Sequence, residues 1–507
     1  MRFKFPIRSI LGISVMMSGM TFGAFAQNFE GTWESLGLYK CPEWFRDAKL
    51  GIFLHWGPSS VAAVDSWYGR NMYVQGQRAY EYHVKTFGHP SKFGFKDLIQ
   101  LWKAENFDPD RLVRVFKQAG AGYIVPVASF HDNFDLWDST YQRWNAVKMG
   151  PKKDIVALWR KAALANGLKF GASTHMDRTL SWFNTSKGSD TTGPLAGIPY
   201  DGSDPQNADL YGPKNDEDPA WPYLPKNAPE FWRKTWAIRT RDLIDKYHPD
   251  LLYFDGGIPY VDVGLPLVAH FYNENQKWNG GRLDAVLNLK KTKVSGAYRE
   301  GMCVQDLERS KLEGIKPEPW QTDTSIGPWF YERGARYETP DAIIDMFVDI
   351  VSKNGNLLLN IPLRADGTLD AEETALLAEM AKWMAVNGEA IFGSRPWIVY
   401  GEGPTSVKAD YSERIEDVFT SQDFRFTTKG NAIYAACLNW PGERVTIKSL
   451  NVLRPDEIRS VRMLGVDQDL EWTLKKEGLS IKRPAKKPCN YAFVFKIVRG
   501  NGGGSDH

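Results

Sequence analysis

Residues 251–257 read LLYFDGG, a short apolar run that ends in the carboxylate of Asp255 and two glycines. The run is too short for a typical helix, and apolar residues on both faces are typical of a fully buried strand. Five other runs have the same character and also end in polar residues. They cover residues 51–55, 123–128, 169–174, 285–289 and 356–361.

Amphipathic stretches between these runs predict helices, for example over residues 109–119, 153–166 and 229–247. Glycines or a His-Pro pair follow these stretches, as expected where helices end. The alternation of strand and helix predicts a parallel sheet covered by helices. We therefore expect an α/β fold whose first unit is a (β/α)8-like, TIM-type barrel.

The pattern changes near residue 395. A helical stretch over 371–387 is followed by short alternating stretches between Gly, Pro and Asp turns, which is typical of an antiparallel β-sandwich. We expect a catalytic barrel over 27–395, a supporting C-terminal antiparallel β-sandwich over 396–499 and a disordered tail over 500–507. The alternating stretches are 424–427, 432–438, 444–447, 457–464 and 491–497.

Residues 1–26 have the three parts of a secretory signal peptide: basic residues such as Arg2 and Arg8, an apolar run, and an Ala-x-Ala-like end at Ala26. We expect cleavage after Ala26 and export to the periplasm or out of the cell. The apolar run is too short and too interrupted to cross a bilayer, which takes about 20 residues, and no later stretch qualifies.

Composition bounds the class of partner. The 507 residues are 43% hydrophobic and 24% charged, as in a soluble globular protein of two or three units. A formal net charge of +2 gives no broad attraction for nucleic acid or anionic membranes. The 19 Trp and 21 Tyr offer apolar faces with polar edges, which suit sugar rings, so we expect a carbohydrate partner. The oligomeric state stays open.

The four cysteines, Cys41, Cys303, Cys437 and Cys489, have no paired metal-ligand spacing, which argues against a zinc site. Export would permit disulfides, and Cys437 with Cys489 is the pair to test. Four buried free thiols are the alternative.

Polar residues close several of the predicted strands. In a parallel barrel, catalytic residues gather at the carboxyl ends of the strands. Three of these ends carry histidines, His55, His131 and His175, and the fourth carries Asp255 with two glycines that would allow a ligand to approach closely. Asp255 is the first candidate for catalysis, although capping of a turn is the structural alternative.

A nucleophilic Asp in a retaining glycosidase needs a second carboxyl group, protonated at rest, about 5–5.5 Å away. Later segments offer four: Asp306, Glu308, Glu313 and Asp323. The residues alone do not choose among them.

A metal site is the alternative use of the histidines. His55, His131 and His175 could act together from separate strands in metal-dependent hydrolysis, but the chain has no tight spacing such as HxH or HExxH among them. We expect no metal and no other cofactor.

Several motifs stand in order along the chain. They are WFRDAK (44–49), GIFLHWG (51–57), WY (67–68), RNMY (70–73), FDP (107–109), HD (131–132), LWDS (136–139), NLLLNIP (356–362), DG (366–367) and NGEAIFG (387–393). Together they resemble the α-L-fucosidases of glycoside hydrolase family 29 over nearly the whole mature chain. The resemblance implies an enzyme that hydrolyses terminal α-L-fucosyl residues, with an Asp nucleophile and a Glu acid/base.

The resemblance also implies roles for single residues. The family's nucleophile lies in a Trp-Phe-Asp-Gly type motif, which reads YFDG (253–256) here and points to Asp255. Glu308 best resembles the acid/base, with Glu313 in reserve. Of the sugar-binding residues, His55, Trp67 and His131 match the family.

Two further residues beside the strand ends, His175 and Tyr253, are also expected to bind substrate. The Gly- and Pro-rich segment 186–229 is too long for a routine connection and is expected to shape the leaving-group side.

Five positions depart from the pattern of many relatives. Phe130 replaces a His, Ser66 replaces a Glu, the pair 173–174 replaces aromatic residues, and Lys290 stands where Arg is common. Lost hydrogen-bonding groups change which hydroxyls are recognised. L-galactose or another relative of L-fucose is therefore the alternative sugar, and a catalytically silent carbohydrate-binding protein is the alternative of another class.

Overall fold

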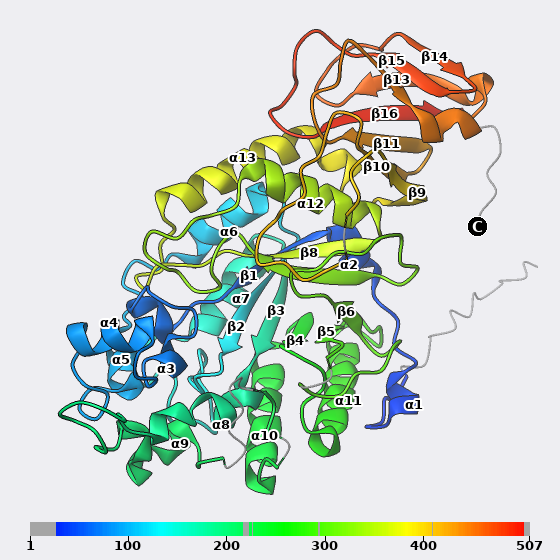
Figure 1. Cartoon of the computed structure of the whole chain (residues 1–507). Helices are drawn as coiled ribbons and strands as arrows, with labels where there is room; N and C mark the ends of the chain where they lie inside the picture. The colour runs from blue at the N-terminus through cyan, green and yellow to red at the C-terminus, as the bar shows by residue number, and fades with distance from the viewer. Residues whose placement is uncertain (1–26, 216–222, 226, 293–294, 408, 501–507) are drawn as a thin grey trace, which may run out of the picture.

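The computed structural model describes residues 27–215, 223–225, 227–292, 295–407 and 409–500. Its centre is a closed barrel of eight parallel strands in chain order, with β8 paired to β1 (Figure 1). The predicted TIM-type barrel is confirmed. The strands are β1 (Leu50–Leu54), β2 (Tyr123–Ser129), β3 (Lys169–Thr174), β4 (Leu251–Phe254), β5 (Val286–Lys290), β6 (Val304–Asp306), β7 (Trp320–Ser325) and β8 (Gly355–Asn360).

Six of these strands fall on the six predicted apolar runs. The remaining two, β6 and β7, were not predicted as strands. They were missed because β7 is polar in sequence, although every residue in it is buried. Its polar side chains form hydrogen bonds with residues of other strands. Gln321 accepts from the Tyr123 hydroxyl at 2.8 Å and donates to Asp306 at 2.8 Å. Such pairing removes the cost of burying polar groups.

Helices cover the outside of the barrel, and the three predicted between strands correspond to α6, α7 and α10. Asp108 and Asp154 cap α6 and α7 by accepting backbone N–H groups three residues on, as expected of N-cap residues. The helices are α1 (Trp33–Leu36), α2 (Glu43–Ala48), α3 (Tyr68–Asn71), α4 (Arg78–Thr86), α5 (Phe95–Leu101), α6 (Pro109–Gln118), α7 (Ile155–Ala165), α8 (Thr179–Trp182), α9 (Ala208–Tyr211), α10 (Glu230–Tyr247), α11 (Val261–Trp278), α12 (Pro340–Ser352) and α13 (Ala371–Asn387).

The segment 186–229 contains 3-10 turns and α9 in its described part. It packs against the insertion that carries α3 to α5, through two buried carboxylates. Asp190 accepts hydrogen bonds from the hydroxyls of Tyr80 and Tyr200, each at 2.6 Å, and Asp201 accepts from Tyr73 at 2.7 Å. The described part of the segment is therefore held in place against this insertion.

The C-terminal part contains two antiparallel sheets that enclose their own apolar core, so the predicted β-sandwich is confirmed. One sheet has the order β13-β16-β11-β10-β9 and the other β12-β15-β14. The strands β9, β14 and β15 were not predicted. The strands are β9 (Arg395–Glu402), β10 (Phe424–Lys429), β11 (Ala432–Cys437), β12 (Arg444–Ile447), β13 (Ile458–Met463), β14 (Trp472–Lys475), β15 (Gly478–Lys482) and β16 (Phe493–Arg499).

Barrel and sandwich meet through α12 and α13, which lie between the barrel strands and the C-terminal sheets in Figure 1. A buried ionic group joins them. Asp349 of α12 accepts from Arg425 of β10 at 2.5 Å and from Lys353 at 2.7 Å, and all three side chains are almost fully buried.

The four cysteines are free thiols, so the proposed pairing of Cys437 with Cys489 is not found. Cys437 donates to backbone oxygens inside the sandwich and is buried, whereas the other three are only partly buried. Within the described part of the chain, no helix has the length and apolar character needed to cross a membrane. The predicted signal peptide (1–26) and residues 501–507 of the predicted tail lie outside the described residues.

Candidate active site

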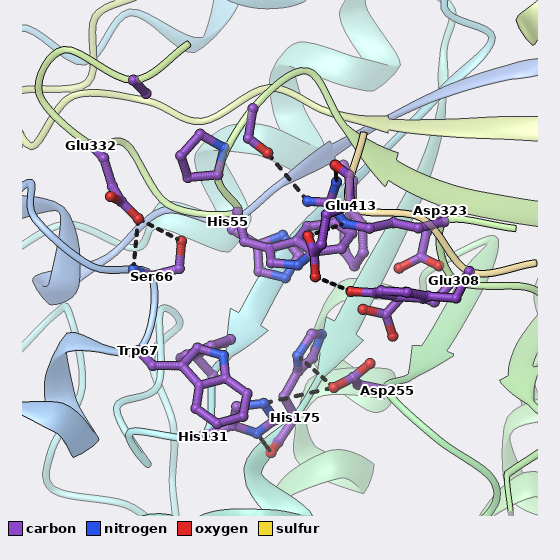
Figure 2. Close-up of a pocket in the computed structure, with 18 of the residues that line it drawn as sticks. His55, Ser66, Trp67, His131, His175, Asp255, Glu308, Asp323, Glu332 and Glu413 are labelled. Carbon is purple, nitrogen blue, oxygen red and sulfur yellow. Dashed lines mark hydrogen bonds and ion pairs between the residues drawn. The ribbon is translucent and has the colours of Figure 1, made fainter. Parts of the chain in front are cut away.

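A cavity of about 530 Å³ opens at the carboxyl ends of the barrel strands, and Figure 2 shows it from close by. Six of the seven predicted site residues line it. The seventh, Tyr253, is fully buried and is not among the described residues that form the wall. The six are His55, Trp67, His131, His175, Asp255 and Glu308.

Asp255 follows β4 directly, and the two glycines after it have a structural role. The backbone of residues 295–297 comes so close that a Cβ atom on Gly257 would lie 2.5 Å from the Ala297 carbonyl oxygen. The Gly257 N–H donates to the Ser295 oxygen at 2.5 Å. The glycines therefore admit a neighbouring loop, not the ligand that the sequence suggested.

The carboxylate of Asp255 contacts two cations. Its Oδ1 lies 2.7 Å from Lys290 Nζ, and its Oδ2 lies 3.3 Å from Arg178 Nη2. Burial alone would raise the pKa of Asp255, but the charges of Arg178 and Lys290 outweigh burial and hold that pKa well below its usual range. Asp255 is therefore ionised at neutral pH.

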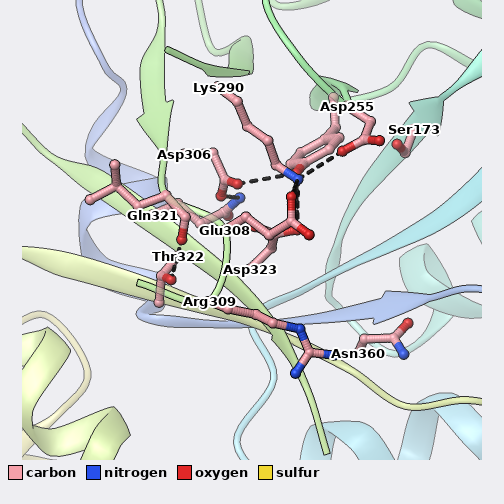
Figure 3. A network of polar contacts seen from close by, with 12 residues as sticks. Ser173, Asp255, Lys290, Asp306, Glu308, Arg309, Gln321, Thr322, Asp323 and Asn360 are labelled. Carbon is pink, nitrogen blue, oxygen red and sulfur yellow. Dashed lines mark hydrogen bonds and ion pairs between the residues drawn. The ribbon is translucent and has the colours of Figure 1, made fainter. Parts of the chain in front are cut away.

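Glu308 lies just after β6 and meets the same lysine. Its Oε2 is 2.7 Å from Lys290 Nζ, and its side chain is 34% exposed. Figure 3 draws this ion pair as a dashed line. Burial raises the pKa of Glu308, and the negative charges of Asp323 and Asp255 add to this effect, while Lys290 opposes it. The two carboxyl groups on Lys290 are thus shifted in opposite directions.

The other three candidate carboxyl groups are less well placed. Glu313 is exposed and does not contribute to the described cavity wall. Asp306 is buried below the cavity, where burial and the charge of Asp323 raise its pKa well above the usual range. Asp323 lines the cavity 3.3 Å from Lys290 Nζ, but its side chain is only 2% exposed.

Tyr253 lies beneath the cavity and contacts the carboxyl groups of Asp306 and Asp323. Its hydroxyl lies 3.0 Å from Asp306 Oδ2 and 3.1 Å from Asp323 Oδ2, and its ring lies 5.8 Å from Lys290 Nζ. The ring therefore contacts the ammonium group that Asp255 and Glu308 share. From this position Tyr253 can orient Asp306 and Asp323 directly, and Asp255 and Glu308 through Lys290.

The three histidines are buried together around the cavity. His131 Nε2 and His175 Nδ1 each lie 3.7 Å from Asp255 Oδ2, and His55 Nδ1 is 2.9 Å from the side-chain oxygen of Asn360. Burial lowers the pKa of His55 to about 4 and that of His131 to about 3, and it lowers that of His175 well below its usual value. Each ring is therefore neutral near pH 7 and offers one donor and one acceptor.

Aromatic rings separate these polar groups. The Phe130 ring lies 4.4 Å from His131, 5.9 Å from His55 and 4.8 Å from Phe330 between ring centres. Trp67, labelled in Figure 2, also lines the cavity, and its ring centre lies 5.1 Å from that of Trp182, which in turn lies 5.4 Å from the Phe130 ring centre. The wall thus combines hydrogen-bonding groups with apolar faces, as a sugar ring requires.

A carboxylate lies next to Ser66 even though Ser66 replaces the Glu that is common in relatives. Glu332, from the segment after β7, accepts from the Ser66 N–H at 3.2 Å and from its hydroxyl at 3.4 Å, and it lines the cavity. Burial and the charge of Asp65 raise the pKa of Glu332. A distant part of the chain therefore supplies an acidic group at this wall.

A metal ion could be held geometrically, although not by the predicted three histidines. The ligand atoms of His131, His175 and Asp255 lie within 4.8 Å of one another, and His55 is outside this group. Arg178 and Lys290 already contact Asp255. Their charges oppose the binding of a cation there.

The family model for α-L-fucosidase matches residues 18–389, and the model for the α-L-fucosidase C-terminal domain matches residues 417–498. The chain belongs to the α-L-fucosidase family. It is a glycoside hydrolase, and the resemblance read from its motifs is confirmed.

Similar proteins cover almost all of the chain. Plasma α-L-fucosidase of Homo sapiens is 28% identical over 515 residues, which span 93% of this chain and 93% of that protein. The Thermotoga maritima α-fucosidase, solved with a mechanism-based inhibitor, has a TM-score of 0.72 and 26% identity and covers 93% of this chain and 100% of its own. Its structure with fucose gives a TM-score of 0.70 and 27% identity at the same coverage.

In this α-L-fucosidase family member, several cavity residues were not predicted as site residues. Arg178 lies three positions after His175, so a wider window at the end of β3 would have included it. The outer wall carried no such signal, because it combines residues 327–336 with residues 411–414 of the C-terminal part. Segment 186–229, which was expected there, contributes no described residue to the wall.

Proposed function

We propose that the chain is a retaining, exo-acting α-L-fucosidase that removes terminal α-L-fucosyl residues from oligo- or polysaccharides, with Asp255 as nucleophile and Glu308 as acid/base. Family membership supports the hydrolysis of α-L-fucosides. The bound fucose in the Thermotoga maritima relative supports the same sugar. The residue roles rest on the geometry of this chain.

The observation that carries the proposal is the shared contact with Lys290. Asp255 Oδ1 and Glu308 Oε2 each lie 2.7 Å from Lys290 Nζ, so these two oxygens are at most twice 2.7 Å apart. Retaining glycosidases hold their two carboxyl groups about 5–5.5 Å apart, whereas inverting enzymes need roughly 6.5–9.5 Å to admit a water molecule. The separation supports retention.

The opposite pKa shifts support the division of labour. A nucleophile has to be ionised, and the pKa of Asp255 is lowered by Arg178 and Lys290 against the effect of burial. A general acid has to hold a proton, and the pKa of Glu308 is raised by burial and by neighbouring carboxylates. Two carboxyl groups with pKa values pushed apart are characteristic of an acid and a nucleophile.

In the first step, an oxygen of Asp255 forms a bond to the anomeric carbon while the bond from that carbon to the leaving oxygen breaks. The Glu308 proton passes to the leaving oxygen. In the second step, Glu308 takes a proton from water, the water oxygen bonds to the anomeric carbon, and Asp255 leaves as a carboxylate. Two inversions give fucose with the α configuration retained.

The remaining residues would bind the fucosyl ring. His55, His131 and His175 are neutral and can donate to or accept from its hydroxyls. Trp67 and Phe130 offer apolar faces for the ring and for its methyl group. Tyr253 is proposed to support the carboxylates from below, in place of the substrate contact that the sequence suggested.

Azide can test the two roles separately. In Asp255→Ala, azide can enter the space of the carboxylate and attack 4-nitrophenyl α-L-fucoside directly, so we expect the β-fucosyl azide. In Glu308→Ala, the glycosyl-enzyme still forms from this activated substrate and azide attacks it from the opposite face, so we expect the α-fucosyl azide. The configuration of each product is read by NMR.

Glu313→Ala is the matched control, because Glu313 was the reserve candidate and is exposed outside the cavity wall. It should hydrolyse the fucoside like the unmodified enzyme and give no azide product. An Asp255→Ala enzyme with full activity, or azide rescue in Glu313→Ala and not in Glu308→Ala, would overturn the assignment.

We also propose that residues 1–26 direct export to the periplasm or outside the cell, that 27–395 form the catalytic unit, and that 396–499 form the sandwich. The change of topology between α13 and β9 supports that boundary. Sequencing the N-terminus of the exported protein tests the first part, and we expect it to begin at Gln27.

A further inference from the structure

The outer wall of the cavity is built by two segments far apart in sequence. One follows β7 and contributes residues such as Trp329 and Arg336, and the other lies between β9 and β10 and contributes Tyr411, Glu413 and Arg414. The second segment connects two neighbouring strands of the larger sandwich sheet. The C-terminal part therefore reaches over the mouth of the barrel.

Specific bonds hold this second segment against the residue that follows Glu308. Arg309 donates from Nη1 to the Glu413 carbonyl oxygen at 2.8 Å, and the Ser412 N–H donates to the Arg309 carbonyl oxygen at 3.1 Å. Arg309 also stacks on Trp329, with 4.7 Å between the guanidinium carbon and the ring centre. The segment is thus fixed next to Glu308.

The other side of the segment is held by Arg414. Its Nε lies 2.9 Å from Glu338 Oε1, and its Nη1 donates to the Arg336 carbonyl oxygen at 3.0 Å. Residues 411–414 therefore bridge the loop after β6 and the segment after β7. A wall held from both sides is pre-organised for a ligand.

Tyr411 presents the ring of this wall. Its side chain is 53% exposed, although it lines the cavity, and its hydroxyl donates to Glu413. Glu413 lies near Glu308 in the view of Figure 2, on the side of the cavity away from Trp67. Burial, the hydrogen bond to Glu413 and the charge of Glu308 raise the pKa of Tyr411, which is consistent with a position close to Glu308.

The position of the proposed acid, Glu308, determines which part of the substrate lies next to the Tyr411 ring. Glu308, as the proposed acid, protonates the oxygen that leaves, so the group attached to that oxygen has to lie on the Glu308 side. Arg309 follows Glu308 directly and binds the Glu413 backbone, and Tyr411 is close enough to be affected by the charge of Glu308, so these three lining residues lie on that side. A half-exposed aromatic ring with its hydroxyl held in place is well suited to the apolar face of a sugar.

The charges of the cavity point to an uncharged ring. Five cationic and five acidic side chains line it, so it has no surplus that would select an ionic leaving group. Arg309 and Arg414 are each within 3.4 Å of a glutamate. Arg336 is exposed at the mouth and has no carboxylate partner among the described side chains, so its guanidinium can donate to sugar hydroxyls.

We propose that Tyr411, Glu413 and Arg336 form a binding subsite for the leaving group, and that this subsite takes an uncharged sugar ring stacked on Tyr411. The inference rests on the proposed function, because it uses Glu308 to define the leaving-group side. It assigns a substrate-binding role to the C-terminal part, in addition to support of the barrel.

Two substrates separate this subsite from the chemistry. α-L-Fucosyl fluoride has no ring on its leaving group, whereas an α-L-fucosyl-galactose disaccharide has one, and the linkage isomer that the enzyme hydrolyses fastest is used. For Tyr411→Ala we expect kcat/KM on the disaccharide to fall about tenfold, equivalent to losing roughly 55 Å² of apolar contact. On the fluoride we expect a change within about twofold.

Two further variants serve as matched controls. Tyr411→Phe keeps the ring and should retain most of the activity on the disaccharide. Tyr141→Ala removes a tyrosine that is exposed to a similar extent, 51%, and does not line the cavity, so neither substrate should be affected. Arg336→Gln should lower only the disaccharide rate, by about threefold, whereas the exposed Arg333→Gln should not.

The outcomes keep the two proposals apart. An unmodified enzyme that releases no fluoride from fucosyl fluoride would contradict the proposed function itself. Equal losses on both substrates in Tyr411→Ala, or no loss on the disaccharide, would overturn the subsite. A third substrate, the same disaccharide with galacturonic acid in place of galactose, carries a charge on the leaving ring. Faster hydrolysis of this substrate than of the galactose disaccharide would overturn the preference for an uncharged ring.

Discussion

Asp255 and Glu308 are joined by one cation, because Lys290 Nζ lies 2.7 Å from an oxygen of each. The arrangement fixes the spacing of the two carboxyl groups and couples their ionisation. It also places a positive charge beside Asp255, which has to stay ionised, and beside Glu308, which becomes negatively charged when its proton passes to the leaving oxygen. The shared ammonium group therefore links the two proposed roles.

Replacing Lys290 by Met should shift the acid side of the pH profile. The pKa of Asp255 is held down by Arg178 and Lys290, so loss of one cation raises it, and activity then falls at a higher pH as the solution is made more acidic. We expect kcat/KM to fall roughly 100-fold, which is about 2.7 kcal/mol. Lys290→Arg, which keeps the charge, should leave the acid limb closer to its original position. An unmoved acid limb in Lys290→Met would contradict the role.

The basic side of the profile should follow Glu308. This group has to be protonated for the first step, so activity is lost as the pH rises through its raised pKa. The negative charge of Asp323 contributes to that raised value. In Asp323→Asn we therefore expect the basic limb of kcat/KM to move to lower pH. Glu313→Gln is the control and should leave the limb unchanged, and a shift to higher pH in Asp323→Asn would refute the electrostatic argument.

Phe130 should favour the methyl group of fucose over the hydroxymethyl group of galactose. Its ring packs against that of Phe330, with 4.8 Å between the ring centres, and a hydroxyl held against these two apolar rings without a partner would cost about 1–3 kcal/mol. We expect 4-nitrophenyl α-L-fucoside to be hydrolysed at least about tenfold faster than the α-L-galactoside. Phe130→His should reduce the ratio of the fucoside rate to the galactoside rate. A preference of the unmodified enzyme for the galactoside would instead identify L-galactose as the sugar.

A chelator should leave the activity unchanged. His131, His175 and Asp255 are close enough to bind a metal, but two cationic side chains contact Asp255 and oppose this. Dialysis against EDTA followed by assay on the fucoside checks the expectation. Loss of activity that zinc or manganese restores would support metal-dependent hydrolysis through these three residues.

The buried carboxylate of Asp349 should matter for stability. It meets Arg425 and Lys353 in the contact between barrel and sandwich, and Asp349→Ala would leave both cations unpaired. Removing one partner of a buried ion pair costs roughly 3–5 kcal/mol. Urea unfolding gives the difference. Asp47→Ala breaks a more exposed pair with Arg395 across the same boundary and should cost about 1 kcal/mol or less.

The barrel was predictable because apolar strands carry a strong signal, and six of its strands lay on apolar runs. β7 gave no such signal, because its buried side chains are polar and are satisfied by partners from other strands, such as Tyr123 and Asp306. Asp255 was singled out because it follows a predicted strand, whereas Glu308 was one of four candidate carboxyl groups until the family resemblance favoured it. Their electrostatic partners depend on which strands become neighbours, so Lys290 was noted only as a departure from a pattern.

The outer wall of the cavity could not be predicted from the sequence for a similar reason. Nothing in the sequence near Tyr411 indicates that this residue returns to the mouth of a barrel that ends many residues earlier. Its position depends on the bonds that Arg309 and Arg414 make with distant segments. Contacts of this kind become visible only in three dimensions.

The crossing of residues 411–414 over the barrel mouth has a consequence for comparing and engineering relatives. A chain shortened after α13 would keep Asp255 and Glu308 but would lose one wall of its cavity. Exchanging the C-terminal part between two family members would then transfer acceptor selectivity, while the bond-breaking chemistry stayed with the barrel. Under the proposed subsite, the sandwich with its connection between β9 and β10 forms a module through which the family can diversify its acceptors.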